Sequence, residues 1–223
     1  KIIDFGSSCF KNEVSFSYIQ SRFYRAPEVI LGAKYDEKID VWSFGCVAAE
    51  LFTGSPLLPG KNELEQVGLM LELFGCPSAL YIQNSRKKLT RTVELQKQKL
   101  IDGERARTTD LGGSNYLTFT NTNVPTITEK SLRKTLLFSL FDLEGKINLQ
   151  FLNMRLQSLR SQSGNFKKSV KVSSRILDIA LKLGKSDNKR DPANFSRFLH
   201  SIFQWDPQQR PSCSELLMDP FLN

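Results

Sequence analysis

The segment from Ile39 to Gly54 constrains the fold most, because a helix built from it would carry apolar residues on nearly every side. It reads Ile-Asp-Val-Trp-Ser-Phe-Gly-Cys-Val-Ala-Ala-Glu-Leu-Phe-Thr-Gly. A helix that is apolar all round is normally buried, and Gly54 followed by Pro56 is a typical helix end. We therefore predict a central core helix that the other elements of the chain must surround.

A second helix is predicted shortly after this segment. Asn62 followed by Glu65 has the spacing of a capping box, in which each side chain bonds the backbone of the other residue. The apolar residues that follow recur at helical spacing: Leu64, Val67, Leu71 and Phe74. We expect this helix to end at Gly75.

The middle of the chain, from about residue 85 to 190, is rich in Ser, Thr, Asn, Lys and Arg, and we interpret it as an insert. Leucines recur at helical spacing over residues 132–141 and 152–159. Between them, Lys146–Phe151 alternates polar and apolar residues like a strand. We expect these apolar residues to pack the insert onto the rest of the chain.

Helical spacing returns from Asn194 to Phe203, and within it His200 is expected to be partly buried and without a catalytic role. Ser212, with Glu215 three residues later, predicts a cap for a last short helix, Glu215–Met218. The chain is thus predicted to be mainly α-helical after a short N-terminal strand.

Basic residues concentrate in the insert. Between residues 85 and 175 there are 18 Lys and Arg against 7 Asp and Glu, a local net charge of +11 in a chain of net charge +8. Such charge could displace counterions from nucleic-acid phosphates. However, no aromatic interleaving and no known nucleic-acid motif accompanies it. We therefore favour a solvated insert and keep nucleic acid as the less favoured partner.

The cysteine spacing and the hydropathy of the chain indicate in which cellular compartment the protein is expected. Cys9, Cys46, Cys76 and Cys213 include no CxxC pair, and the chain has one histidine to help bind a metal. This pattern argues against a zinc site and against a disulfide framework. No apolar run reaches the roughly 18 residues that a membrane-spanning helix needs. We expect a cytoplasmic or nuclear protein without a membrane partner.

Four short motifs follow one another in order. They are Asp4-Phe5-Gly6, Ala26-Pro27-Glu28, Asp40-Val-Trp-Ser-Phe-Gly45 and Trp205-Asp-Pro-Gln-Gln-Arg210-Pro. One tripeptide alone is a weak signal, but the ordered set resembles the C-terminal part of a eukaryotic protein kinase domain, from the metal-binding DFG motif onward. The resemblance implies a mainly α fold, the large helical C-terminal lobe of a kinase, with the N-lobe and the catalytic loop absent from the chain.

Within the kinases, the chain is similar to the dual-specificity tyrosine-regulated (DYRK) family of the CMGC group. The similar stretches are Ser7-Ser-Cys9, Tyr18-Ile-Gln-Ser-Arg-Phe-Tyr-Arg25-Ala-Pro-Glu-Val-Ile-Leu-Gly32 and Pro56-Leu-Leu-Pro-Gly60. Relatives often carry a tyrosine pair where this chain has Phe16-Ser17-Tyr18, so only the second tyrosine is kept. The resemblance covers residues 1–80 and about 194–223, roughly half of the chain.

We accordingly divide the chain into three parts. Residues 1–84 are expected to hold the activation segment and the core helices of the lobe. Residues 85–190 form the basic, family-variable insert, which is expected to tune substrate choice. Residues 191–223 are expected to form the final helices of the lobe.

The resemblance implies roles in cofactor binding and catalysis for Asp4, Phe5, Gly6 and Ser21, and a structural role for Asp40. Asp4 is expected to bind Mg²⁺ at the phosphates of ATP, with Phe5 and Gly6 completing the cofactor-binding motif. Ser21 is expected to hydrogen-bond the catalytic aspartate. Asp40 is expected to accept backbone N–H groups of the catalytic loop, since a carboxylate on so apolar a helix needs partners.

The resemblance also implies a phosphate-binding site and a buried ion pair. Tyr18 is the expected phosphosite, and Arg22 and Arg25 are expected to clamp its phosphate with charge-assisted hydrogen bonds. Glu28 and Arg210, far apart in sequence, are expected to form a buried ion pair. Breaking that pair would leave one charge buried alone, at a cost on the order of 3–5 kcal/mol.

These roles imply an ATP- and Mg²⁺-dependent kinase that autophosphorylates Tyr18 and phosphorylates Ser and Thr of protein substrates. The Gly-rich loop, the strand lysine and the His-Arg-Asp loop are missing from the sequence, so this chain alone is expected to be inactive without its own N-lobe. Two alternatives stay open. One is a fragment of a catalytically dead kinase-like scaffold, and the other is a basic module that binds nucleic acid or acidic partners.

Overall fold

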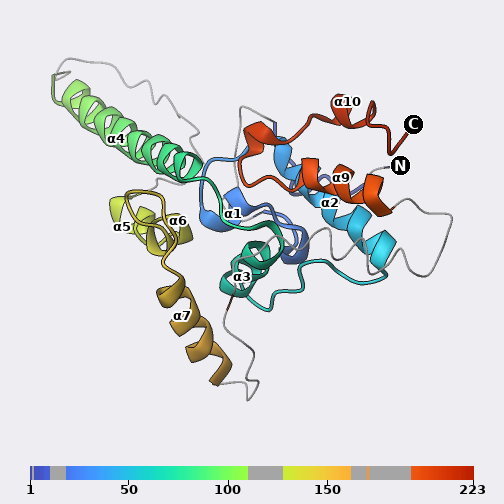
Figure 1. Ribbon diagram of the computed structural model, residues 1–223. Coiled ribbons are helices and arrows are strands. Elements are labelled where there is room, and N and C mark those ends of the chain that lie inside the picture. The colour runs from blue at the N-terminus through green and yellow to red at the C-terminus, as the bar shows by residue number, and fades with distance from the viewer. Residues whose placement is uncertain (2, 11–18, 110–127, 162–169, 171–191) are drawn as a thin grey trace.

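The structure is a computed structural model that describes residues 1, 3–10, 19–109, 128–161, 170 and 192–223. In these ranges the chain is mainly helical, as predicted (Figure 1), and forms no strand beyond an isolated antiparallel bridge between Phe141 and Ile147. The predicted short N-terminal strand is not formed by the described residues 1 and 3–10. The elements are, in chain order, η1 (Arg22–Tyr24), α1 (Pro27–Leu31), α2 (Lys38–Thr53), α3 (Glu63–Phe74), α4 (Ala79–Thr109), α5 (Glu129–Leu132), α6 (Leu136–Leu140), α7 (Leu149–Ser161), α9 (Pro192–Ile202), η2 (Pro207–Gln209) and α10 (Cys213–Leu216).

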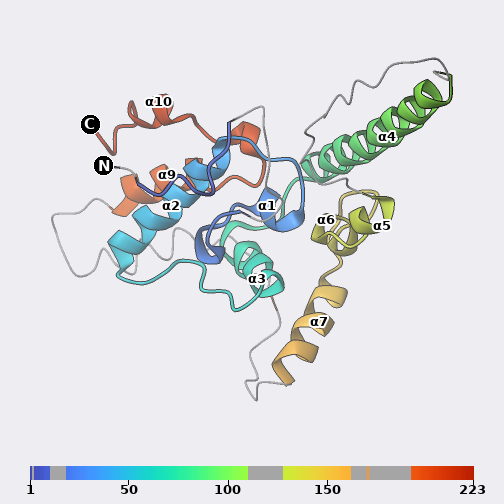
Figure 2. The ribbon, with the colours of Figure 1, turned by 180° about the vertical axis from the view of Figure 1, so that it is seen from behind.

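Helix α2 lies at the centre of the lobe and runs beside α9 (Figures 1 and 2). The Trp42 ring is fully buried and packs edge-on against Phe74 and Phe203, with ring centroids 5.3 and 5.0 Å apart. Gly45 permits the close approach of α9, because a Cβ atom at this position would lie 2.6 Å from the side chain of Ile202. The predicted core helix is therefore the packing centre of the fold.

One face of α2 departs from the prediction of burial on every side. Phe44, Val47 and Leu51 are 45%, 44% and 80% exposed, and their spacing places them on the same side of the helix. The described part of the chain leaves this stripe open to solvent. The all-round apolar pattern therefore reflects two packing surfaces, of which these residues of the chain cover one.

Helix α3 begins and ends where the sequence predicts. The Asn62 side chain accepts a hydrogen bond from the backbone N of Glu65 at 2.9 Å. Gly75 follows the last helical residue with a φ of 77°, a conformation that residues with a side chain rarely adopt. Trp205 donates from Nε1 to the carbonyl of Gly75 at 3.0 Å, which ties this helix end to the C-terminal segment.

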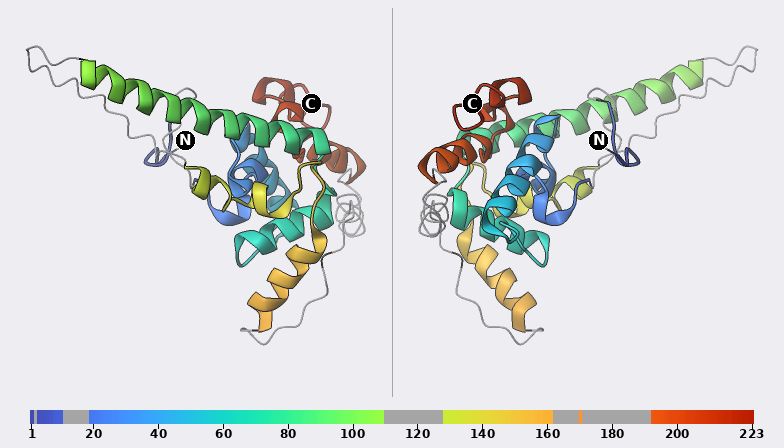
Figure 3. Two further views of the ribbon diagram at one scale, coloured as in Figure 1. Left: turned by 90° about the vertical axis from the view of Figure 1, so that its left-hand side faces the viewer. Right: turned by 90° about the vertical axis from the view of Figure 1, so that its right-hand side faces the viewer.

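Helix α4 extends well beyond the rest of the lobe (Figure 3). Its first half belongs to the core, since Ile82, Leu89 and Val93 are at most 4% exposed, whereas Leu95 is 54% exposed. The expected boundary between residues 84 and 85 thus falls inside a continuous helix whose buried face runs across it. The expected boundary at residues 190 and 191 lies outside the described residues.

Helices α5, α6 and α7 pack the middle of the chain onto the lobe. Five of the leucines at helical spacing are at most 5% exposed: Leu132, Leu137, Leu140, Leu152 and Leu156. Leu159, near the end of α7, was expected to pack as well but is 42% exposed. The predicted strand at Lys146–Phe151 is wrong, because α7 begins at Leu149. The Asn148 side chain accepts a hydrogen bond from the backbone N of Phe151 at 2.9 Å, and such an N-cap starts a helix.

The last helix, α10, has the predicted capping box. The Ser212 side chain accepts from the backbone N of Glu215, and the Glu215 carboxylate accepts from the backbone N of Ser212 at 2.6 Å. The hydrogen bonds from the backbone and side chain of Ser212 lower the pKa of the Glu215 carboxyl. The helix lies two residues N-terminal of its predicted bounds, and His200 on α9 is exposed rather than partly buried.

The structure shows the state of the four cysteines and the polarity of the described helices. All four cysteines are unpaired, and Cys46 is the buried one among them. Burial in the apolar core raises the pKa of the Cys46 thiol, so this residue behaves as a small core side chain. In the described ranges, every helix is too short or too polar to cross a bilayer.

Candidate functional site

The N-terminal motif forms a tight turn that presents Asp4. The carbonyl of Phe5 accepts hydrogen bonds from the backbone N and the Oγ of Ser8, at 3.0 and 2.7 Å. Asp4 has a φ of 61°, in the left-handed region that Asp tolerates better than most residues with a side chain. Because Asp4 is exposed, its carboxylate is accessible to a ligand.

Four of the sequence-predicted residues line one cavity of about 620 Å³. Asp4 comes from the N-terminal turn, Ser21 precedes η1, and Asp40 lies in the first turn of α2. Phe5 also lines the cavity. The other described candidates do not line it: Gly6, Arg22, Arg25, Glu28 and Arg210. The fold therefore brings the expected metal-binding and catalytic residues, together with Asp40, to one cavity, and it keeps the expected ion pair apart from them.

The cavity has acidic walls, since Asp36 and Glu37 line it together with Asp4 and Asp40. Partial desolvation raises the pKa of the Asp40 carboxyl. In the described ranges, no group of three Asp, Glu, His or Cys side chains could hold a metal ion by itself. Mg²⁺ is usually bound by one or two carboxylates together with substrate phosphates and water. Asp4 fits such a site as a single carboxylate ligand.

Gln20 positions the segment between the cavity and α1, although the sequence analysis did not select it. Its Nε2 donates to the carbonyl of Ile39 at 2.9 Å and to Oγ of Ser43 at 2.7 Å. Its Oε1 accepts from the backbone N of Ala26 at 2.9 Å. One amide thus ties both ends of segment 20–26 to α2, and the residue itself has a φ of 69°.

Gln66 also bridges two backbone segments through its amide group. The sequence did not indicate this role. It is fully buried on α3. Its Nε2 donates to the carbonyl of Arg22 at 2.8 Å, and its Oε1 accepts from the backbone N of Gly60 at 3.0 Å. Gln20 lies within the family-similar stretch Tyr18–Gly32, but that likeness alone does not assign it a bridging role. Gln66 lies in none of the quoted motifs, and its helical position does not separate a buried bridge from a solvated side chain.

Arg25 is 2% exposed, and its guanidinium group closes the same segment. Nε and Nη2 donate to the carbonyl of Gln20 at 3.2 and 2.8 Å, and Nε also donates to the carbonyl of Ile19 at 2.9 Å. Nη1 donates to Glu63 at 3.2 Å. The expected clamp residue is therefore already bound to backbone carbonyls and to one carboxylate.

Arg22, the other expected clamp residue, has one hydrogen-bond donor without a partner among the described residues. Its Nη1 donates to the carbonyl of Lys61 at 2.8 Å, but its buried Nε has no hydrogen-bond partner among the described residues. Leaving a buried donor unpaired costs about 1–3 kcal/mol, which an incoming acceptor would offset. Tyr18, the expected phosphosite, lies outside the described residues.

Glu28 on α1 and Arg210 after η2 form a buried, two-bond ion pair. Nη1 and Nη2 of Arg210 donate to the two carboxylate oxygens of Glu28, each at 2.6 Å, and both side chains are fully buried. The guanidinium also lies 5.1 Å from the ring centroid of Trp42. The pair joins α1 to the segment that follows η2, and it has the partners that the resemblance implies.

Comparison with known proteins agrees with this arrangement. The family model described as "Protein kinase domain" matches residues 1–222. Among solved structures, the crystal structure of a kinase domain matches 100% of this chain with a TM-score of 0.58 and 27% sequence identity. The chain covers 47% of that kinase domain structure.

Curated relatives are similar over a shorter stretch. The serine/threonine-protein kinase ppk5 of Schizosaccharomyces pombe is 61% identical over 87 residues, 39% of this chain and 10% of the relative. The dual specificity tyrosine-phosphorylation-regulated kinase 4 of Homo sapiens is 56% identical over 90 residues, 40% of this chain and 17% of the relative. The alignments thus span less than a fifth of either relative. The chain belongs to the protein kinase domain family, in which its relatives include the dual-specificity tyrosine-regulated kinases.

Proposed function

We propose that the protein is an ATP-dependent dual-specificity protein kinase and that this chain supplies part of its helical lobe, from the metal-binding motif onward. The kinase autophosphorylates Tyr18 and then transfers phosphate to Ser and Thr of protein substrates in the cytoplasm or nucleus. The cavity shared by Asp4, Ser21 and Asp40 carries the proposal. The expected metal ligand (Asp4), the expected partner of the catalytic aspartate (Ser21) and the expected structural residue (Asp40) come there from separate segments.

Each of these side chains has a defined task. Bound Mg²⁺ neutralises charge on the phosphates of ATP during transfer. Asp4 supplies the hard carboxylate oxygen that such an ion prefers. Ser21 offers a hydroxyl at the same cavity, where it orients the catalytic aspartate. Asp40 offers acceptor oxygens to the backbone N–H groups of the catalytic loop.

Phosphorylation of Tyr18 completes the activation segment. A phosphate group carries a charge of about −1.5 to −2 and several strong acceptor oxygens. The unpaired Nε of Arg22 is a suitable donor for it, and Arg25 contributes positive charge from the same segment. Because Gln20 and Arg25 already fix residues 19–26, a phosphate held by Arg22 would extend this order toward Tyr18.

The remaining parts of the kinase would cover the open face of α2. Phe44, Val47 and Leu51 form an exposed apolar stripe, and Asp40 lies in line with it at the cavity end of the same helix. We infer that the protein's own N-lobe and catalytic loop complete this face and the site. This chain by itself is accordingly expected to be inactive.

A phosphotransfer assay tests the proposal. The full-length protein is incubated with radiolabelled ATP, Mg²⁺ and casein as a generic protein substrate. Asp4→Asn should lower transfer at least about 100-fold, equivalent to about 2.7 kcal/mol of transition-state stabilisation. Asp102→Asn, at an exposed position on α4, is the matched control and should have no effect. A folded wild-type protein without any transfer would favour the scaffold alternative instead.

A further inference from the structure

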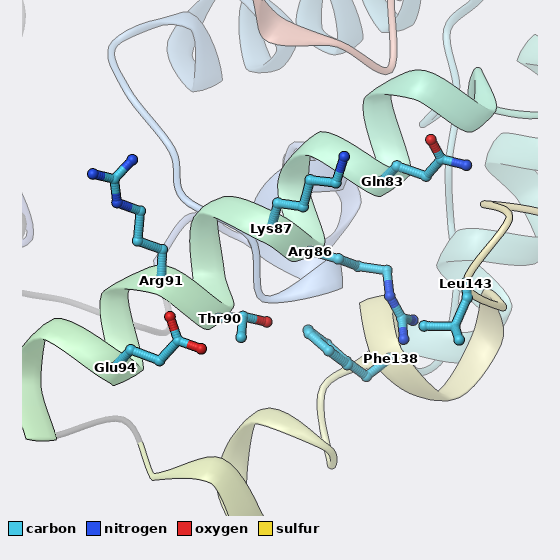
Figure 4. Close-up of a pocket in the computed structure, with 8 residues that line it drawn as sticks. All are labelled: Gln83, Arg86, Lys87, Thr90, Arg91, Glu94, Phe138 and Leu143. Atoms are coloured by element: carbon cyan, nitrogen blue, oxygen red, sulfur yellow. The ribbon is translucent and has the colours of Figure 1, made fainter.

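A second cavity, of about 670 Å³, lies between α4 and the loop that follows α6 (Figure 4). None of its lining residues belongs to the candidate catalytic cavity. Its size is within the range of about 300–1,000 Å³ that is typical of ligand pockets. The helix α4 contributes one wall, while Phe138 and Leu143 contribute the other. We call this cavity the α4 groove.

Arg86 holds the two walls of the α4 groove at a fixed distance. Its Nη1 donates to the carbonyls of Leu137 and Phe141, at 3.2 and 2.8 Å. Its guanidinium carbon lies 4.2 Å from the ring centroid of Phe138, and Figure 4 shows the side chain extended toward Phe138 and Leu143. Because these contacts bridge α4 and α6, the groove is preformed.

The far wall of the groove is apolar and open. Leu143 is 75% exposed, and the partly buried Phe138 lines the same cavity. Among the described residues, nothing covers most of the Leu143 side chain. Apolar groups of a partner could therefore be buried here, at roughly 25 cal/mol for each Å² removed from water.

The helical wall is basic. Residues 79–93 of α4 contain four basic residues and no acidic one: Arg86, Lys87, Lys88 and Arg91. Lys87 and Arg91 are exposed, lie one turn apart and line the groove. Figure 4 shows their charged ends directed away from Phe138, which places them at the rim. In the described part of the chain, neither forms an ion pair.

The acidic groups nearby leave this rim positive. Glu94 is the one acidic side chain among the residues that line the groove. Asp142, in the loop after α6, interacts with Arg86, which is already bound to backbone carbonyls. The charges that remain available to a ligand are those of Lys87 and Arg91, so the groove combines an apolar wall with two accessible cations.

We propose that the α4 groove docks a short acidic segment of a partner protein. Carboxylates of the segment bind Lys87 and Arg91, and an apolar side chain packs against Phe138 and Leu143. An apolar wall that includes the aliphatic Leu143 favours a peptide, because a peptide can place an apolar side chain next to its carboxylates, whereas a nucleic acid has no aliphatic side chain to bury. Where the partner is a phosphorylation substrate, the proposal rests on the proposed kinase function, whereas docking itself does not.

The test measures binding of a fluorescein-labelled peptide of about 12 residues, made only of Glu, Asp, Leu and Ala, to the full-length protein without ATP. Changes in fluorescence anisotropy give the Kd. The variant Lys87→Glu/Arg91→Glu should weaken binding at least about tenfold. The variant Lys88→Glu/Arg155→Glu changes the net charge equally at exposed positions outside the groove, and it should stay within about twofold.

A separate experiment tests whether an apolar side chain of the peptide packs against Leu143. Leu143→Ser is tolerated by the fold because the side chain is largely exposed, and it should weaken binding at least about threefold. A peptide with Ser in place of every Leu should bind the wild-type protein equally weakly. Both results would support apolar packing of the peptide in the α4 groove.

Three outcomes would overturn the proposal. They are the absence of peptide binding, an equal loss in the two charge-reversal variants, and an oligothymidine of the same length that binds as tightly as the peptide with the same dependence on Lys87 and Arg91. A protein that binds the peptide but transfers no phosphate would contradict the proposed function and leave the docking site standing.

Discussion

Arg210 uses every one of its hydrogen-bond donors inside the protein. A guanidinium group has five N–H bonds. Two bind Glu28, and the others bind the carbonyls of Lys38, Gln204 and Trp205, at 3.1, 2.8 and 3.3 Å. One residue thereby connects α1, α2 and the C-terminal segment, so its loss should affect the stability of the whole lobe.

We predict that Arg210→Ala lowers the free energy of unfolding by about 3–5 kcal/mol, because the Glu28 carboxylate would remain buried without its partner. Lys88→Ala, at an exposed position on α4, is the control and should change stability by less than about 0.5 kcal/mol. Urea unfolding of the full-length protein measures both. Arg210→Lys should fall in between, since it keeps the charge but has three donors. Coincident unfolding midpoints would contradict the inferred role of the pair.

The helices show which features a sequence can predict. The ends of α3 depend on Asn62 and Gly75, which act within one turn, and both were predicted correctly. The strand predicted at Lys146–Phe151 is wrong, because the Asn148 side chain caps a helix there despite the alternating polar and apolar residues. No helix was predicted over the span of α4, since only its first half has an apolar face that packs on the lobe and its second half has no such pattern.

The two halves of α4 should respond differently to the same substitution. Leu89 is 3% exposed, whereas Leu95 is 54% exposed. We predict that Leu89→Ala destabilises the protein by about 2–4 kcal/mol, through lost burial and the cavity left behind. Leu95→Ala should cost less than about 0.5 kcal/mol. Thermal unfolding of the two variants makes the comparison, and equal shifts in Tm would show that the core extends along α4.

At the scale of the whole molecule, the arrangement of the lobe creates the candidate site. The order of the motifs predicted the kinase resemblance and the Glu28–Arg210 pair, whose geometry the structure shows. The convergence of Asp4, Ser21 and Asp40 on one cavity is implied by the resemblance and by no local pattern. The bridges made by Gln20 and Gln66 could not be predicted, because their function depends on backbone groups that only the fold brings near.

The central claim is that the protein transfers phosphate to its own Tyr18 through a site that includes Asp4. Phosphopeptide mapping by mass spectrometry of the full-length protein, expressed in bacteria and incubated with ATP and Mg²⁺, tests it most directly. The wild-type protein should carry phosphate on Tyr18, and Asp4→Asn should leave that residue unmodified while Asp102→Asn retains the modification. An active wild-type protein with unmodified Tyr18, or an Asp4→Asn protein phosphorylated there to the same extent, would contradict the claim.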